Sequence, residues 1–227
     1  RKCRILNSAL DRATGSYVVI SDGDCIPRPD FLATHNRLAA PGRFLSGGRI
    51  CVTREVFDLL TQRDVVKGSI FDVTWLRVRK ALPRVRDILK LSSNAFANAF
   101  DRFTLTRATW NGHNSSGWRT DFLAVNGFDE RMGYGGEDRE FGERLRNYGV
   151  RPRQVRHRAV CVHLDHDRDY IREEVRSKNE RIRRDTRGVP KALSRFDSWM
   201  KGPTWTEFGI RKIPRPEDQD AGQNGTN

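Results

Sequence analysis

The sequence predicts an α/β fold, because short apolar runs alternate with segments of helical periodicity. Residues 17–20 (YVVI) and 159–163 (AVCVH) are nearly continuous apolar runs, typical of strands buried on both faces. Residues 4–13 instead place apolar side chains at helical spacing, and Gly15 ends that segment. Strands that alternate with helices indicate a mostly parallel sheet flanked by helices.

The other predicted elements come in this order: a helix at 31–39 capped by Asp30, a strand at 49–52, helices at 54–60, 120–125 and 137–148, and a charged helix that ends near Arg184. Residues 75–91 alternate cations with apolar side chains, and Pro83 interrupts them. We expect an amphipathic surface element packed on the core. The alternative is a basic flap near a membrane or a substrate.

The composition predicts a soluble, globular chain, since 37% of the residues are hydrophobic and 31% are charged. No run of about 18 apolar residues, the length that spans a bilayer, occurs. The four cysteines form no CxxC pair, which argues against a zinc site or a disulfide framework and suits a reducing cytosol. The net charge of +13 indicates anionic partners: nucleic acid, phosphorylated small molecules or an acidic membrane surface.

A candidate metal site follows the first strand. Asp22-Gly23-Asp24 comes directly after residues 17–20, and ligands of open α/β sheets bind outside the carboxyl ends of the strands. Two carboxylates around a glycine offer hard oxygen ligands to Mg²⁺ or Mn²⁺, which would bridge to a diphosphate. The alternative is a polar turn, because Asp and Gly are common turn residues.

Two histidines lie three residues apart at the end of another strand. His163 and His166 follow the apolar run at 159–163. Imidazole together with carboxylate is a plausible ligand set for a transition metal such as Mn²⁺. A structural or solvent-exposed role is the alternative for each histidine.

Two adjacent carboxylates, Glu137 and Asp138, follow a pair of glycines in the run GYGGEDREF. A helix N-terminus stabilises an acidic side chain by about 0.3–1 kcal/mol, so these residues need no function to explain them. The other interpretation is that one of them accepts a proton.

Three blocks of the chain together resemble the family 2 glycosyltransferases, which have a GT-A, Rossmann-like α/β fold. They are ILNSALDRATGSYVVISDGDCIPRPDF, GHNSSGWRTDFLAVNGFDERMGYGGEDREFGERLRNYG and AVCVHLDH. The middle block is also similar to the C-terminal part of the β-1,4-galactosyltransferases, whose hallmark is a Trp-Gly-Gly-Glu-Asp run. The resemblance spans roughly residues 4–168 and leaves 54–109 unmatched.

The resemblance implies a metal-dependent hexosyltransferase that inverts the anomeric carbon while it moves a sugar from a nucleotide diphosphate, expected to be UDP, to an acceptor hydroxyl. It implies Asp138 as the general base and Asp22 beside the donor ribose or a metal-bound water. The ligands of Mn²⁺ or Mg²⁺ would be Asp24, His163 and His166. The implied substrate-binding residues also include an aromatic platform, two glycines that let the backbone approach a sugar, a residue that holds sugar hydroxyls and two further polar residues: Tyr134, Gly135, Gly136, Glu137, Arg119 and Asp121.

The implied partners are a nucleotide-sugar donor and a glycan or glycolipid acceptor, in polysaccharide, lipopolysaccharide or glycolipid synthesis. We expect no nucleic acid, a cytoplasmic location and peripheral contact with an anionic membrane. The family's N-terminal nucleotide-binding unit is missing from the sequence, so we expect a partial, truncated catalytic domain at 1–168, a charged helical extension at 169–213 and a disordered tail at 214–227. The alternatives are a catalytically inactive sugar-binding GT-A-like domain and a basic nucleic-acid-binding module.

Overall fold

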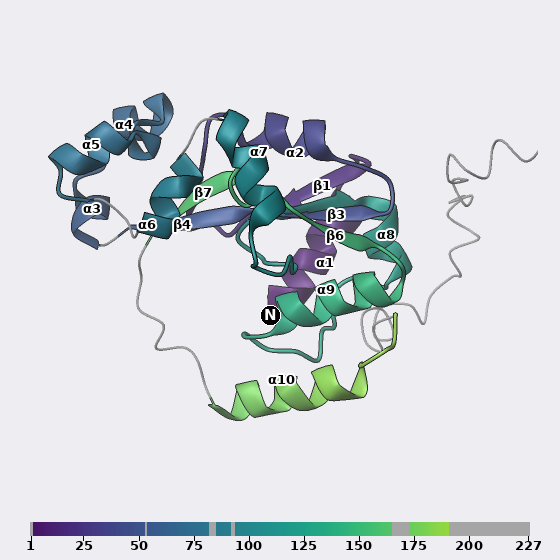
Figure 1. Cartoon of the computed structure of the whole chain (residues 1–227). Helices are drawn as coiled ribbons and strands as arrows, with labels where there is room; N and C mark the ends of the chain where they lie inside the picture. The colour runs from purple at the N-terminus through teal and green to yellow at the C-terminus, as the bar shows by residue number, and fades with distance from the viewer. Residues whose placement is uncertain (1, 53, 82–84, 92–93, 165–172, 191–227) are drawn as a thin grey trace, which may run out of the picture. The chain divides into compact units, whose positions relative to one another are not determined.

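A computed structural model describes residues 2–52, 54–81, 85–91, 94–164 and 173–190 (Figure 1). Residues 1–195 form one compact unit, while the second unit, 196–227, and with it the predicted tail, lies outside the described residues. Helices flank the strands, so the predicted α/β class is confirmed. Within the described residues no helix is long and apolar enough to cross a membrane.

The strands are β1 (Tyr17–Ile20), β2 (Cys25–Pro27), β3 (Arg43–Ser46), β4 (Gly48–Val52), β5 (Ser115–Trp118), β6 (Arg151–Gln154) and β7 (Val160–Leu164). The helices are α1 (Lys2–Arg12), α2 (Phe31–Leu38), α3 (Arg54–Asp58), α4 (Gln62–Lys67), α5 (Val73–Val78), α6 (Val85–Ile88), α7 (Asn94–Phe103), α8 (Arg119–Ala124), α9 (Glu137–Asn147) and α10 (Glu173–Asp185), with short 3₁₀ turns η1 (Ser69–Phe71) and η2 (Leu89–Leu91). Every helix and strand expected from periodicity is present, with ends within a few residues of those predicted.

The strands form two sheets of mixed direction, ordered β1-β5-β3-β6 and β2-β7-β4. The prediction of a mostly parallel sheet was wrong. The β1–β5, β3–β5 and β2–β7 pairs are antiparallel, and only β3–β6 and β4–β7 are parallel. The unpredicted strands carry no long apolar run, because β3, β5 and β6 are short and rich in polar residues and β2 has only 3 residues. Strands β2 and β5 supply the antiparallel pairs.

Strand β5 is buried although its sequence, SSGW, is polar and small. Its Ser116 hydroxyl bonds to the Tyr17 hydroxyl (2.8 Å) and to His35 Nδ1 (2.7 Å). His35 Nε2 bonds in turn to Asn114 Oδ1 (2.9 Å). Since each of these groups has a hydrogen-bond partner, the strand can be buried without a large desolvation penalty.

The prediction that the Asp30 side chain caps α2 was also wrong. Asp30 precedes the helix, but its side chain accepts no hydrogen bond from the helix backbone. The carboxylate is instead held by Arg28, whose Nε and Nη2 donate to its two oxygens at 2.6 and 2.9 Å.

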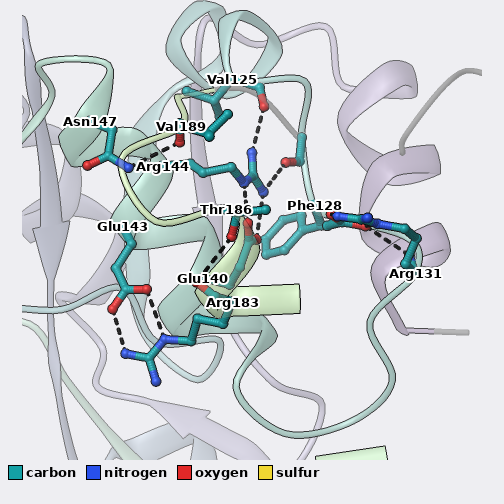
Figure 2. A network of polar contacts seen from close by, with 12 residues as sticks. Val125, Phe128, Arg131, Glu140, Glu143, Arg144, Asn147, Arg183, Thr186 and Val189 are labelled. Carbon is teal, nitrogen blue, oxygen red and sulfur yellow. Dashed lines mark hydrogen bonds and ion pairs between the residues drawn. The ribbon is translucent and has the colours of Figure 1, made fainter. Parts of the chain in front are cut away.

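Helix α9 is fixed by contacts of residues near its middle, and Figure 2 shows those of Glu140 and Arg144. The fully buried Arg144 donates to both carboxylate oxygens of Glu140, at 2.6 and 2.9 Å. It also donates to the carbonyls of Val125 (2.6 Å) and Gly127 (2.7 Å). Phe141 stacks on Phe128 and packs edge-on against Trp110 in the main hydrophobic core. These contacts set where the first turn of α9 lies.

The described residues between 54 and 91 form short helices rather than the single amphipathic element predicted for 75–91. Ile70 and Val56 are buried in a second core with Ile50 of β4 and Val162 of β7, and Trp75 packs against it. The predicted packing on the core is therefore confirmed. Pro83 lies outside the described residues.

Candidate active site

The Asp22-Gly23-Asp24 turn lies between β1 and β2, at the end of β7. The backbone N–H of Cys25 donates to the Asp22 carbonyl (3.2 Å), which closes the turn. The antiparallel register of β2 and β7 places Cys25 opposite His163. As a result, Asp24 Oδ2 lies 3.4 Å from His163 Nε2.

Three side chains there can offer ligand atoms to one metal ion. Single ligand atoms of Asp24, Cys25 and His163 all lie within 4.8 Å of one another. The set contains carboxylate, imidazole and thiol, which suits a transition metal such as Mn²⁺ better than Mg²⁺, whose ligands are oxygens. The neighbouring Cys161 and burial raise the pKa of the Cys25 thiol, so Asp24 and His163 are the better ligands. The other predicted ligand, His166, lies outside the described residues.

The glycine pair before α9 adopts backbone conformations that favour glycine. Gly135 and Gly136 have φ angles of +103° and +90°. The loop is held from α10, where Asn179 Nδ2 donates to the carbonyl of Gly135 (2.7 Å) and Asn179 Oδ1 accepts from the N–H of Gly133 (3.0 Å). Glu137 is turned back onto the loop, and its Oε2 accepts from the Gly135 N–H (2.6 Å).

Asp138 is held through one oxygen and leaves the other unpaired. Its Oδ2 accepts a hydrogen bond from the backbone N–H of Gly112 (2.9 Å). Its Oδ1 is buried and has no hydrogen-bond partner within the described residues. A buried acceptor without a partner is rare in folded proteins, and here it indicates a place where a ligand hydroxyl can donate.

One cation joins the two carboxylate motifs. Lys2 Nζ, from the first turn of α1, lies 3.7 Å from Asp22 Oδ1, 3.0 Å from Glu137 Oε1 and 3.9 Å from Asp138 Oδ2. It also lies 5.6 Å from the centre of the Tyr134 ring, which is 39% exposed. The first and third distances limit the gap between the Asp22 and Asp138 oxygens to less than 8 Å, since both contact one atom.

The electrostatics of this cluster favour a base that works near neutral pH. The pKa of Asp138 is raised to about 6, mainly by burial and also by Glu137 and Asp22, against the lowering effects of Lys2 and the Gly112 N–H. Burial alone would lower the pKa of Lys2, but Asp138, Glu137 and Asp22 together raise it. Lys2 is therefore charged and Asp138 is ionised above about pH 6, in the range where a general base is most effective.

Two predicted substrate-binding residues lie away from this cluster. Arg119 follows Trp118, which pairs with Tyr17 at the opposite end of β1 from Asp22. Its Nε donates to the Leu10 carbonyl (2.9 Å), so it fastens α1 to α8. Asp121 lies in the first turn of the same helix, α8. The structure thus brings the two carboxylate motifs together with His163 but not with this pair.

Sequence reasoning missed three contributors to the cluster: Lys2, Gly112 and Cys25. The strand register that places Cys25 beside His163 and the helix packing that places Lys2 beside Asp138 are tertiary features without a local pattern. Gly112 could have been noticed as a glycine in a buried segment, but only the coordinates show that a Cβ there would lie 2.9 Å from Asp138 Oδ2.

Residues 95–167 match a protein-family model described as the N-terminal domain of galactosyltransferase. This part of the chain is glycosyltransferase-like. The match includes the Glu137-Asp138 motif and His163 but not the Asp22-Gly23-Asp24 turn. The likeness to galactosyltransferases is confirmed, although the description names their N-terminal domain where the sequence resemblance named the C-terminal part.

The solved structures that match include the mannosyltransferase PcManGT from Pyrobaculum calidifontis in complex with GDP-Man and Mn²⁺. The alignment has 24% sequence identity and a TM-score of 0.41, and covers 81% of this chain and 40% of that one. This chain therefore spans less than half the length of that protein. A comparison with curated protein sequences gives no match.

Proposed function

We propose that this chain carries the catalytic site of a metal-dependent, inverting GT-A glycosyltransferase, related to family 2, that moves a hexose from a nucleotide diphosphate to an acceptor hydroxyl. The observation that carries the proposal is the contact of Lys2 with both carboxylate motifs, since an oxygen of Asp22 and an oxygen of Asp138 lie less than 8 Å apart. The galactosyltransferase likeness of residues 95–167 supports the same class of reaction.

Asp138 is the proposed general base. The acceptor hydroxyl would donate to the unpaired Oδ1, while the Gly112 N–H keeps the carboxylate in place through Oδ2. As the acceptor oxygen forms its bond to the anomeric carbon, its proton passes to Asp138 and the bond from that carbon to the diphosphate breaks. A single displacement with one base inverts the anomeric carbon.

The other residues would position the two substrates. Asp24 and His163 would hold a divalent cation, Mn²⁺ or Mg²⁺, whose charge offsets that of the leaving diphosphate. Glu137, fixed by Gly135 and Lys2, would accept from sugar hydroxyls, and the exposed Tyr134 ring offers a surface on which a sugar can stack. Asp22 would lie beside the donor.

The proposed donor is a UDP-sugar, which is what the resemblance of the sequence to the β-1,4-galactosyltransferases implies. The net charge of +13 supports an anionic environment, such as a glycan or glycolipid acceptor at the inner face of an anionic membrane, within polysaccharide, lipopolysaccharide or glycolipid synthesis. These finer assignments, the cytoplasmic location included, belong to the proposal.

The test compares Asp138→Asn with the wild-type chain and with Glu143→Gln, a carboxylate on the same helix that faces α10. Nucleotide release from UDP-sugars with Mn²⁺ and donor affinity are measured for each protein. We expect Asp138→Asn to lower turnover by roughly 10²–10⁴-fold with donor affinity within about twofold, because general-base catalysis contributes on that scale. The Glu143→Gln variant should keep wild-type turnover.

Unchanged turnover in Asp138→Asn would remove it as the base. Donor binding without any turnover in the wild-type chain would favour the inactive sugar-binding domain. Salt-dependent DNA binding without donor binding would favour the nucleic-acid-binding module.

A further inference from the structure

A second feature lies beside the reaction centre and has no part in the mechanism above. It is a cavity of about 700 Å³ between the β3–β4 turn, η2, the end of β6 and the segment that leads into β5. Its charged lining consists of Arg49, Asp87, Lys90, Arg107 and Arg156. This volume lies within the range of about 300–1,000 Å³ that is usual for small-molecule sites.

The positive charge of the cavity is largely uncompensated. Lys90 is 6% exposed and pairs with Asp87, the one carboxylate among the described lining residues. Within the described part of the chain, the side chains of Arg49, Arg107 and Arg156 make no hydrogen bond or ion pair. Three of the arginines that line this cavity are therefore without a protein anion among the described residues.

The effect of these charges is visible on neighbouring groups. The pKa of His113, which also lines the cavity, is lowered to about 3, mainly by burial and also by Arg49, His163 and Lys90. Burial also lowers the pKa of Lys90, and Arg156 adds to that effect against Asp87. In both groups burial is the largest cause of the shift, and the neighbouring cations act in the same direction.

The cavity adjoins the proposed base. Asn111 and His113 line it, and they flank Gly112, whose N–H holds Asp138. The segment that holds Asp138 in place therefore also forms part of the cavity wall. The Oε1 atom of Gln154, another lining residue, is buried without a hydrogen-bond partner within the described residues and can accept from a sugar hydroxyl.

We propose that this cavity binds an anionic group, phosphate or carboxylate, carried by the sugar acceptor; the assignment to the acceptor rests on the proposed function. The diphosphate of the donor already has its counter-charge at the Asp24–His163 site, where a cation would bind. Guanidinium groups suit the proposed anion, because their planar N–H donors match carboxylate and phosphate oxygens.

The first test measures anion binding without donor or metal. The full chain, in EDTA, is titrated with inorganic phosphate while thermal stability is followed, against NaCl at equal ionic strength. The double variant Arg49→Gln/Arg156→Gln is compared with Arg43→Gln/Arg151→Gln, which removes the same charge from paired strand positions outside the cavity. We expect saturable stabilisation in the wild-type and control proteins, with affinity weakened about tenfold or more in the cavity variant, because hydrogen bonds between charged groups are lost.

Equal responses of the two double variants, or no saturable effect beyond that of NaCl, would overturn the site. If the cavity variant does not fold, Arg107→Gln replaces it. This arginine is exposed, so its removal should weaken phosphate binding without loss of structure.

The second test assigns the anion to acceptor or donor. In one experiment, phosphate is titrated into the wild-type chain in the presence of saturating UDP and Mn²⁺. In the other, it is titrated into the Asp24→Ala variant in EDTA. Additive stabilisation, together with unchanged phosphate affinity in Asp24→Ala, is expected for an acceptor site. Competition between UDP and phosphate would instead assign the cavity to the donor and overturn the proposal. If UDP does not bind while phosphate does, the proposed function fails and the anion site stands.

Discussion

The charge of Lys2 sets the pH range in which Asp138 can act as a base. The ammonium lies 3.9 Å from Asp138 Oδ2 and counteracts the effect of burial on the pKa of that carboxyl, which is about 6. The base is active when ionised, so kcat/KM should be at its maximum well above this pKa and should fall as the pH drops through it. We expect kcat/KM to be halved near pH 6 and to be about tenfold lower near pH 5.

Replacing Lys2 by Met keeps an unbranched side chain and removes the charge. Two unit charges 4 Å apart interact by about 1 kcal/mol in water and about 4 kcal/mol at an effective dielectric constant of 20. One pKa unit corresponds to about 1.4 kcal/mol, so the pKa of Asp138 should rise by about one to three units in Lys2→Met. Turnover at pH 7 should then fall by between about twofold, for a rise of one unit, and about a hundredfold, for a rise of three, and recover as the pH is raised.

The assay is nucleotide release, measured from pH 5 to pH 9.5 for the wild type, Lys2→Met and Arg4→Met. Arg4 lies on the same helix and pairs with Glu130 at 3.5 Å, with its side chain 64% exposed, so its removal should leave the acid limb in place. An acid limb that does not move in Lys2→Met, or a loss of rate that is equal at every pH, would refute the electrostatic role of Lys2.

Three further substitutions test which contacts hold the site in place. Arg144→Met leaves the carboxylate of Glu140 buried and unpaired, so it should lower the free energy of unfolding by about 3–5 kcal/mol in urea titrations. Arg183→Met breaks a pair with the 43% exposed Glu143 and should cost less than about 1 kcal/mol, and equal costs would contradict the reasoning. Gly112→Ala adds a Cβ 2.9 Å from Asp138 Oδ2, so turnover should fall roughly 10–100-fold while the melting temperature changes little. A loss of stability without a loss of turnover would show that Gly112 matters only for packing.

The elements that the sequence predicted well carry their signal locally. Strands β1 and β7 are apolar runs, and α9 begins behind two glycines and ends before Gly149. Strand β5 could not be predicted, because its serines are stabilised by partners such as Tyr17 and His35 that are distant in sequence. The same lack of local signal explains why an antiparallel pairing was taken for a parallel one.

The candidate site was predictable where strand ends supply it and unpredictable where packing does. Because ligands bind at strand ends, Asp24 and His163 could both be predicted as site residues from the sequence. In the structure, Asp24 Oδ2 lies 3.4 Å from His163 Nε2. The position of Lys2 depends on how α1 packs against the start of α9, which no spacing in the sequence encodes. Arg119 lies inside a resembling segment, yet its guanidinium binds the end of α1 instead of the cluster.

The central claim is tested most directly by donor binding. Thermal shifts of the full chain are measured with UDP-, GDP-, CMP- and dTDP-sugars, in Mn²⁺, Mg²⁺ or EDTA, for the wild type, Asp24→Ala and the control Asp58→Ala, an exposed carboxylate at the end of α3. A donor at about 100 times its dissociation constant should stabilise the wild type and the control by about 2.7 kcal/mol. We predict that this stabilisation is lost in EDTA and in Asp24→Ala. No stabilisation by any nucleotide sugar, or stabilisation that persists without metal and without Asp24, would contradict the proposed metal-dependent transferase.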